Sequence, residues 1–192
     1  MPGSALKVWT IGHSTRSIEE FVDLLRGHGI QRLADVRSFP GSRRFPQFNR
    51  DALASELARA GTAYVHLPEL GGLRKPLSDS ANTAWKNDSF RGYADHMQTP
   101  EFQQGLQQLE RLAAEMPTAV MCSEAVWWRC HRSLIADALK VRGAKVLHIM
   151  SVEAPQEHPY TSAARVEAGR LLYDGEPHPG VFARESQSER GA

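Results

Sequence analysis

The sequence has few of the features that mark secreted or membrane proteins. Cysteine occurs only twice in 192 residues, at Cys122 and Cys130, which is too few for the disulfide framework of a small secreted domain and is typical of reduced thiols. No run of about eighteen apolar residues occurs, and the first residues lack a basic segment followed by an apolar stretch. We therefore expect a cytoplasmic protein that has no membrane partner.

An excess of charge of one sign is also missing. The formal net charge is +1, from 23 basic and 22 acidic residues, which argues against a uniformly basic nucleic-acid coat but leaves room for a local basic patch. Hydrophobic residues make up 41% of the chain and charged residues 23%, as in ordinary globular proteins. The length predicts one main domain.

Short β-rich segments alternate along the chain with segments of helical spacing. The predicted strands are residues 7 to 11, 32 to 36, 63 to 67, 118 to 122 and 144 to 150. This alternation predicts an α/β fold, a single domain with a mostly parallel five-stranded sheet covered by helices on both faces. We expect this domain to span residues 1 to 151. Residues 152 to 192 are expected to form a C-terminal extension, partly helical around residues 163 to 172 and then flexible.

Polar and reactive side chains follow the ends of four predicted strands. In an open parallel sheet, ligands bind beyond the carboxyl ends of the strands, where loops and helix N-termini converge. We therefore expect these side chains to meet at one edge of the sheet. A structural role is the alternative for each histidine among them, and His148, in the middle of a strand, is expected to pack in the core. The residues at the strand ends are His13, Asp35, Arg37, His66, Cys122 and Glu124.

The segment MCSEAVWWRCHRS, residues 121 to 133, allows several kinds of chemistry. Zinc would accept Cys122, Glu124, Cys130 and His131 as ligands, but the C-x-x-C spacing typical of zinc sites is missing. We therefore expect no cofactor, although these four residues leave a metal open.

Thiol chemistry is the second alternative for this segment. Cys130 precedes His131 at a predicted helix N-terminus and lies between Arg129 and Arg132, an environment that lowers a thiol pKa and favours a nucleophile. The alternative is a buried, inert cysteine, and for Cys122 at the end of an apolar strand this is the better interpretation.

Anion binding and acid/base catalysis are the remaining alternatives. The arginines at 129 and 132, together with backbone N–H groups of the helix start, could hold a phosphate or carboxylate. Glu124 could be a general base, a nucleophile or only the structural partner of an arginine.

Residues 37 to 50 combine four arginines and three phenylalanines with no acidic residue. Interleaved basic and aromatic side chains can stack on a base while they neutralise a phosphate, which predicts a nucleotide or nucleic-acid ligand for Arg37, Arg43 and Arg44. Trp127 and Trp128 could add further stacking surfaces. The alternative is that the phenylalanines fix the loop to the core while the arginines are solvated.

Several motifs together resemble the family called domain of unknown function 488. They are Thr10 to Ser14 (TIGHS), Asp35-Val36-Arg37 followed by Pro40 and Ser42, Leu70-Gly71-Gly72, Phe90 to Ala94 (FRGYA), and Cys122-x-Glu124 with the CHR motif Cys130-His131-Arg132. The resemblance covers about residues 7 to 151, and Ser123 stands where alanine is more usual. It implies a compact α/β domain and no established reaction. The shared site that it implies contains His13, Asp35, Arg37, Glu124, Cys130, His131 and Arg132.

These observations predict an enzyme, a hydrolase or transferase, that acts on an anionic small molecule or nucleic acid. Glu124 would be its acid/base or nucleophile, with Cys130 and His131 also in the catalytic set and His13 and Asp35 as partners. A non-catalytic nucleic-acid-binding module is one alternative function. A thiol or metal redox protein is another.

Overall fold

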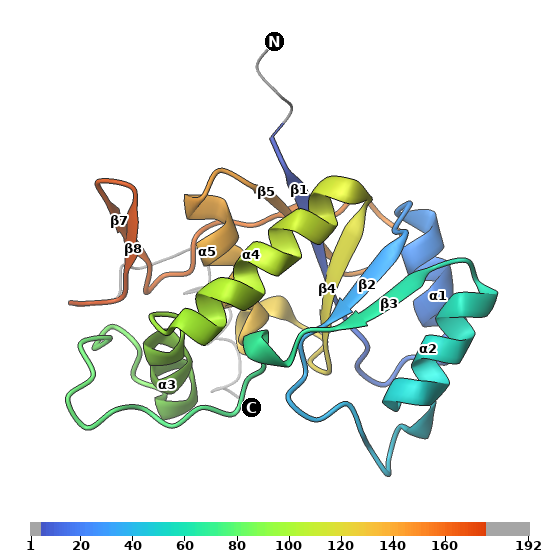
Figure 1. The fold of residues 1–192 in the computed structure, drawn as a ribbon, viewed down its shortest axis with the longest axis horizontal. Helices are drawn as coiled ribbons and strands as arrows, with labels where there is room; N and C mark the ends of the chain where they lie inside the picture. Colours follow the sequence, from blue (N-terminus) through green and yellow to red (C-terminus); the bar gives the residue numbers. More distant parts are fainter. Residues whose placement is uncertain (1–4, 176–192) are drawn as a thin grey trace, which may run out of the picture.

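The computed structural model describes residues 5 to 175, which are built around a six-stranded sheet of order β3-β2-β4-β1-β5-β6 (Figure 1). Five strands are parallel, and the short β6 (Gln156–Glu157) runs antiparallel to β5 at one edge. The sequence predicts the five parallel strands but not β6. The parallel strands are β1 (Lys7–Gly12), β2 (Arg32–Asp35), β3 (Ala63–His66), β4 (Thr118–Cys122) and β5 (Lys145–Ile149).

Helices cover both faces of the sheet, as the sequence predicts (Figure 1). α1 (Ile18–Gly27) and α2 (Arg50–Arg59) pack on one face, and α3 (Asp88–His96), α4 (Pro100–Glu115) and α5 (Arg132–Val141) lie on the other. No helix between residues 5 and 175 is long and apolar enough to cross a membrane.

Local sequence explains where the elements begin and why they are buried. Ser17 caps α1 in a reciprocal capping box with Glu20, so the helix begins at Ile18. All five residues of β4 are buried, as expected of a central parallel strand covered on both faces. Alternate strand residues supply two cores, with Val120 facing the α4 and α5 side and Met121 the α1 and α2 side.

The topology places a crevice at the carboxyl ends of β1 and β4. These strands are neighbours, but β1 leads into α1 on one face and β4 leads towards α5 on the other. Their following loops are joined by backbone hydrogen bonds from His13 N to Cys122 O (3.1 Å) and from Ser14 N to Ser123 O (2.9 Å). Such a divergence between adjacent strands is where open α/β sheets bind ligands.

The predicted helix around residues 163 to 172 is wrong. These residues form an antiparallel hairpin of β7 (Arg165–Glu167) and β8 (Arg170–Leu172). Ala168 and Gly169 both have positive φ, which matches a two-residue hairpin turn whose twist suits the flanking strands. The local preference for this turn therefore decides the structure here, although the spacing of the apolar residues favours a helix. The flexible end predicted for the extension falls largely on residues 176 to 192, outside the described residues.

Candidate functional site

A cavity of about 650 Å³ opens at the carboxyl edge of the sheet. Its walls come from the loops after β1, β2 and β4, from the start of α3 and from the segment that leads into α5. The structure brings most of the predicted site residues together here, although they lie far apart in the sequence. The predicted site residues that line the cavity are His13, Arg37, Arg44, Cys122, Glu124, Arg129, Cys130 and His131.

Asp35 holds Arg37 in place from below the cavity. The fully buried carboxylate accepts two hydrogen bonds from the guanidinium, from Nε at 2.9 Å and from Nη2 at 2.6 Å, and a third from Tyr64 Oη at 2.7 Å. Arg37 Nη2 also donates to Phe48 O at 2.8 Å. Because Asp35 and Phe48 together hold the guanidinium group, the remaining nitrogen, Nη1, has a fixed position. Asp35 is therefore a positioning residue that does not itself line the cavity.

His13 lies next to Arg37 and is uncharged at neutral pH. Burial lowers the pKa of His13 to about 4, although the hydrogen bond to Ser14 O raises it, and Arg37 lowers it further. Its Nδ1 lies 3.0 Å from Ser14 O, which requires the proton on Nδ1 and leaves a lone pair on Nε2, 3.5 Å from Arg37 Nη1. The ring also stacks on Phe48 at 4.3 Å between centroids. His13 is thus a fixed hydrogen-bond acceptor on the cavity wall.

Glu124 is carried by a loop that Arg132 fixes at its backbone. The buried Arg132 donates through Nη2 to Glu124 O (2.7 Å) and to Ala125 O (3.0 Å). A Cβ at Gly12 would come within 1.7 Å of Glu124 O, so a side chain there would displace this loop. The Glu124 side chain is exposed in the cavity and forms no hydrogen bond or ion pair within residues 5 to 175. Arg132, predicted to bind an anion, instead positions the loop.

Cys122, Cys130 and His131 form another part of the cavity wall, in which both cysteines are buried. Cys130 Sγ lies 3.6 Å from His131 Nδ1, and His131 Nε2 lies 3.2 Å from Val36 O. Burial raises the pKa of Cys122 well above its usual value. Burial also opposes ionisation of Cys130, but hydrogen bonds from the Cys122 thiol and the Arg132 backbone, with the Arg132 charge, lower the Cys130 pKa overall.

Basic and aromatic side chains form the rim of the cavity. The guanidinium of Arg44 lies 5.3 Å from the centroid of the Phe45 ring. Phe39 is 78% exposed, so it does not pin its loop to the core. Neither Arg44 nor Arg129 forms an ion pair within residues 5 to 175, which leaves both charges available at the rim.

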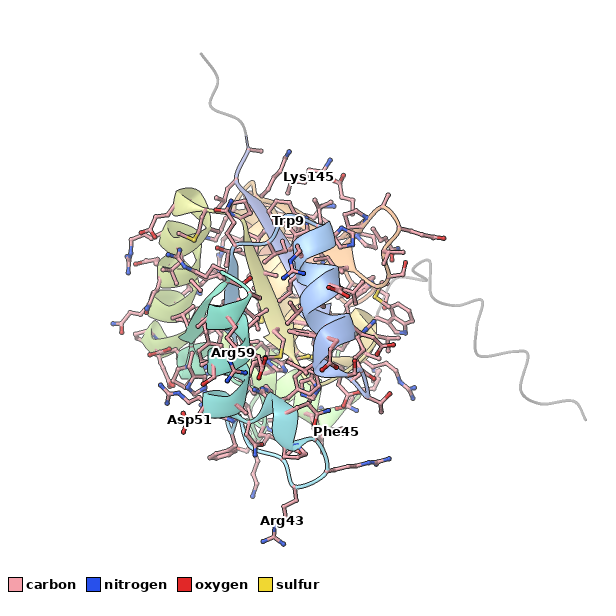
Figure 2. The ribbon with its side chains drawn as sticks, turned by 90° about the vertical axis from the view of Figure 1, so that its right-hand side faces the viewer. Trp9, Arg43, Phe45, Asp51, Arg59 and Lys145 are labelled. Atoms are coloured by element: carbon pink, nitrogen blue, oxygen red, sulfur yellow. The ribbon has the colours of Figure 1, made fainter. Side chains whose placement is uncertain are left out.

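Some predicted residues lie outside the cavity. Trp127 is fully buried and stacks on His148 at 4.2 Å between centroids, so a ligand-stacking role for Trp127 is wrong. Trp128 packs edge-on against Trp127 and does not line the cavity. Arg43 lies at the tip of its loop and points away from the body of the molecule (Figure 2). His66 contacts Arg37 O with Nε2 at 2.8 Å, which supports the loop from behind.

Sequence reasoning missed the wall that residues 72 to 93 provide. Gly72, Leu73, Phe90 and Tyr93 line the cavity opposite β1. A Cβ at Gly72 would lie 2.9 Å from His131 Nδ1, so glycine allows this close approach. Leu73 has a φ of 60° and is 84% exposed, a strained conformation of the kind found at functional sites. The Gly-Gly pair in a long loop was the available signal.

The four residues considered as metal ligands do not form a metal-binding cluster. Within residues 5 to 175, no group of three or more His, Cys, Asp or Glu side chains is placed to hold a metal ion. Cys130 and His131 instead contact each other, and the Glu124 side chain is exposed at the cavity.

Together, the fold and the site define an α/β domain with a basic, aromatic-rimmed cavity at the switch point of its parallel sheet. A family model described as "Domain of unknown function DUF488" matches residues 17–139, and the chain belongs to that family. The match lies within the region of resemblance predicted from the motifs. No curated protein and no solved structure matches the chain.

Proposed function

We propose that the protein is an enzyme, a hydrolase or transferase, that acts on an anionic, nucleotide-like substrate. The single observation that carries this proposal is the position of Glu124. Among the described residues that line the cavity, Glu124 supplies the one carboxylate. It forms no hydrogen bond or ion pair with residues 5 to 175, and Arg37, Arg44 and Arg129 line the same cavity. Arg132 fixes the backbone of the loop that carries this carboxylate, so the carboxylate is already in position when a substrate binds. A carboxylate without a protein partner in such a position can act as an acid/base or as a nucleophile.

The charges of the cavity support an anionic substrate. Arg37, Arg44 and Arg129 outnumber Glu124, and Asp35 compensates Arg37 from outside the cavity. Asp35 and Phe48 occupy the Nε and Nη2 groups of Arg37, so Arg37 would bind an anionic group through Nη1 and its charge. His13, being neutral, would accept a proton or a hydrogen bond from the substrate.

The aromatic rim supports a substrate with a planar group. Phe39, Phe45, Phe90 and Tyr93 line the cavity beside the two rim arginines. A nucleobase could stack on such a surface while its phosphate contacts an arginine. Cys130 and His131 line the same cavity.

Glu124→Gln tests the assignment. This substitution keeps the size of the side chain but removes its charge and its basicity. We expect nucleotide or oligonucleotide turnover, found by substrate screening, to fall by at least about 100-fold, the usual contribution of acid/base catalysis. We expect little change in stability, because the carboxylate forms no hydrogen bond or ion pair with residues 5 to 175.

Glu153→Gln is the matched control, since Glu153 is an exposed carboxylate outside the cavity. It should retain full turnover. If Glu124→Gln is as active as wild type and binds ligand equally well, the catalytic assignment is wrong.

Binding of single-stranded nucleic acid is a second candidate function, favoured by the exposure of Phe39 together with Arg43 and Arg44. The logarithm of the binding constant should then fall linearly with the logarithm of the salt concentration. The double variant Arg43→Ala/Arg44→Ala should reduce the slope of this line by about one for each phosphate contact that is lost. Arg111→Ala, an exposed arginine on α4, is the control and should not change the slope. Binding that does not depend on salt, measured by fluorescence anisotropy with labelled oligonucleotides, would exclude this function.

A further inference from the structure

Cys122 and Cys130 form a pair of free thiols that the proposed function does not use. Cys122 ends β4 and Cys130 precedes α5, and the side chains are only 2% and 4% exposed. Both nevertheless line the cavity, so a small molecule that enters it can reach them. The two side chains belong to the same buried cluster, and a side-chain hydrogen bond between them raises the pKa of Cys122 and lowers that of Cys130.

The surroundings of Cys130 suit a thiolate. His131 Nε2 lies 3.2 Å from the carbonyl oxygen of Val36, which can only accept, so the proton belongs on Nε2. The lone pair on Nδ1 then faces Cys130 Sγ at 3.6 Å and can take its proton. The backbone and the charge of Arg132, in the first turn of α5, also lower the pKa of Cys130, and the helix field at this end favours a negative charge.

The two thiols are therefore unequal. The sulfur of Cys130 receives hydrogen bonds from two donors and has a base beside it. The Cys122 side chain belongs to the apolar core and keeps its proton. A reactive thiolate next to a protonated thiol is the arrangement in which an oxidised sulfur is captured by its neighbour.

We propose that this pair is a peroxide-reactive site, with Cys130 as the attacking thiolate and Cys122 as the resolving thiol. Cys130 gives its proton to His131 and attacks one oxygen of hydrogen peroxide. The S–O bond forms, the O–O bond breaks, and the leaving hydroxide takes the proton from His131 as water. The product is the sulfenic acid of Cys130.

Cys122 then attacks the oxidised sulfur. The S–S bond forms, the S–OH bond breaks, and the hydroxide leaves with the Cys122 proton as a second water. In total, two thiols are oxidised to a disulfide while one peroxide is reduced to two waters. The disulfide would join the end of β4 to the start of α5 and close the loop that carries Glu124.

The test begins with the reduced full-length chain and equimolar hydrogen peroxide. We expect both thiols to be lost together in a thiol titration, the intact mass to fall by two hydrogen atoms, and dithiothreitol to reverse both changes. Loss of one thiol alone in the wild type, or oxidation no faster than that of free cysteine, would overturn the proposal.

Two serine variants separate the roles of the thiols. Cys122→Ser should accumulate a sulfenic acid that a dione reagent traps, since no resolving thiol remains. Cys130→Ser should leave Cys122 unreactive towards peroxide. If instead Cys130→Ser reacts as fast as Cys122→Ser, the assignment of the attacking thiol is wrong.

His131→Gln tests the positioning of the thiolate. We expect about tenfold slower oxidation of Cys130, because the variant lacks the ring nitrogen that takes the thiol proton. Thermal unfolding checks that this variant folds, and the two serine variants carry the test if it does not. An unchanged oxidation rate in folded His131→Gln would remove the role of His131.

Discussion

At the scale of single residues, the site depends on groups held by partners that never reach the ligand. Arg37 is fixed by Asp35, and the loop carrying Glu124 is fixed by Arg132. Asp35 and Arg132 are both almost completely buried, and neither lines the cavity. Sequence patterns locate such residues beside a site but cannot separate the group that contacts a ligand from the group that positions it.

His13 should make the protein less stable in acid. Its pKa is about 4 in the folded protein and about 6.5 when unfolded, so the unfolded chain binds more protons as the pH falls below about 6.5. Its contribution is present above that pH and is lost towards about pH 4. We expect about 2 kcal/mol of the unfolding free energy to be lost between about pH 7 and pH 5 from this group.

Urea unfolding of wild type and His13→Gln at several pH values measures this contribution. The variant lacks the titrating ring, so its stability should fall less steeply with acid than that of the wild type. Equal pH dependence in the two proteins would show that His13 is not held neutral by the fold.

At the scale of elements, prediction from the sequence is good where one strong signal decides. The predicted boundaries of β4, residues 118 to 122, are those of the structure. Prediction fails for very short elements and for segments in which local sequence signals conflict. β6 has two residues, and the β7–β8 hairpin rests on the positive φ of Ala168, a residue that sequence rules assign to a helix.

The same contrast holds for the candidate site. Parallel strands bring their carboxyl ends together, so His13, Arg37 and Glu124 could be placed at one edge from the strand order alone. The direction of a side chain in a loop could not be predicted. Trp127 lies three residues after Glu124, yet it points into the core while Glu124 faces the cavity.

At the scale of the whole molecule, a buried polar chain joins the C-terminal segment to the sheet. Thr10 Oγ1 lies 2.7 Å from His148 Nδ1, His148 Nε2 lies 2.9 Å from His158 Nδ1, and His158 Nε2 lies 2.9 Å from Asp137 Oδ1. His148 is fully buried, which confirms its predicted place in the core, and burial lowers its pKa to about 2. Because the Asp137 carboxylate can only accept, His158 donates to it from Nε2 and accepts at Nδ1 from His148 Nε2, and His148 Nδ1 accepts from the Thr10 hydroxyl.

Asp137 is the anchor of this arrangement and the residue whose change should loosen the C-terminal segment. Its carboxylate also accepts hydrogen bonds from the backbone N and Oγ1 of Thr161 and from Tyr173 Oη. In Asp137→Asn, the amide NH₂ cannot accept, so buried donors lose their partner. We expect a loss of about 3 kcal/mol in unfolding free energy and faster proteolysis within residues 158 to 173.

Asp174→Asn, at the exposed end of the hairpin, is the control and should leave the unfolding free energy and the rate of proteolysis unchanged. If urea unfolding and limited proteolysis do not distinguish the two variants, Asp137 does not hold the C-terminal segment on the domain.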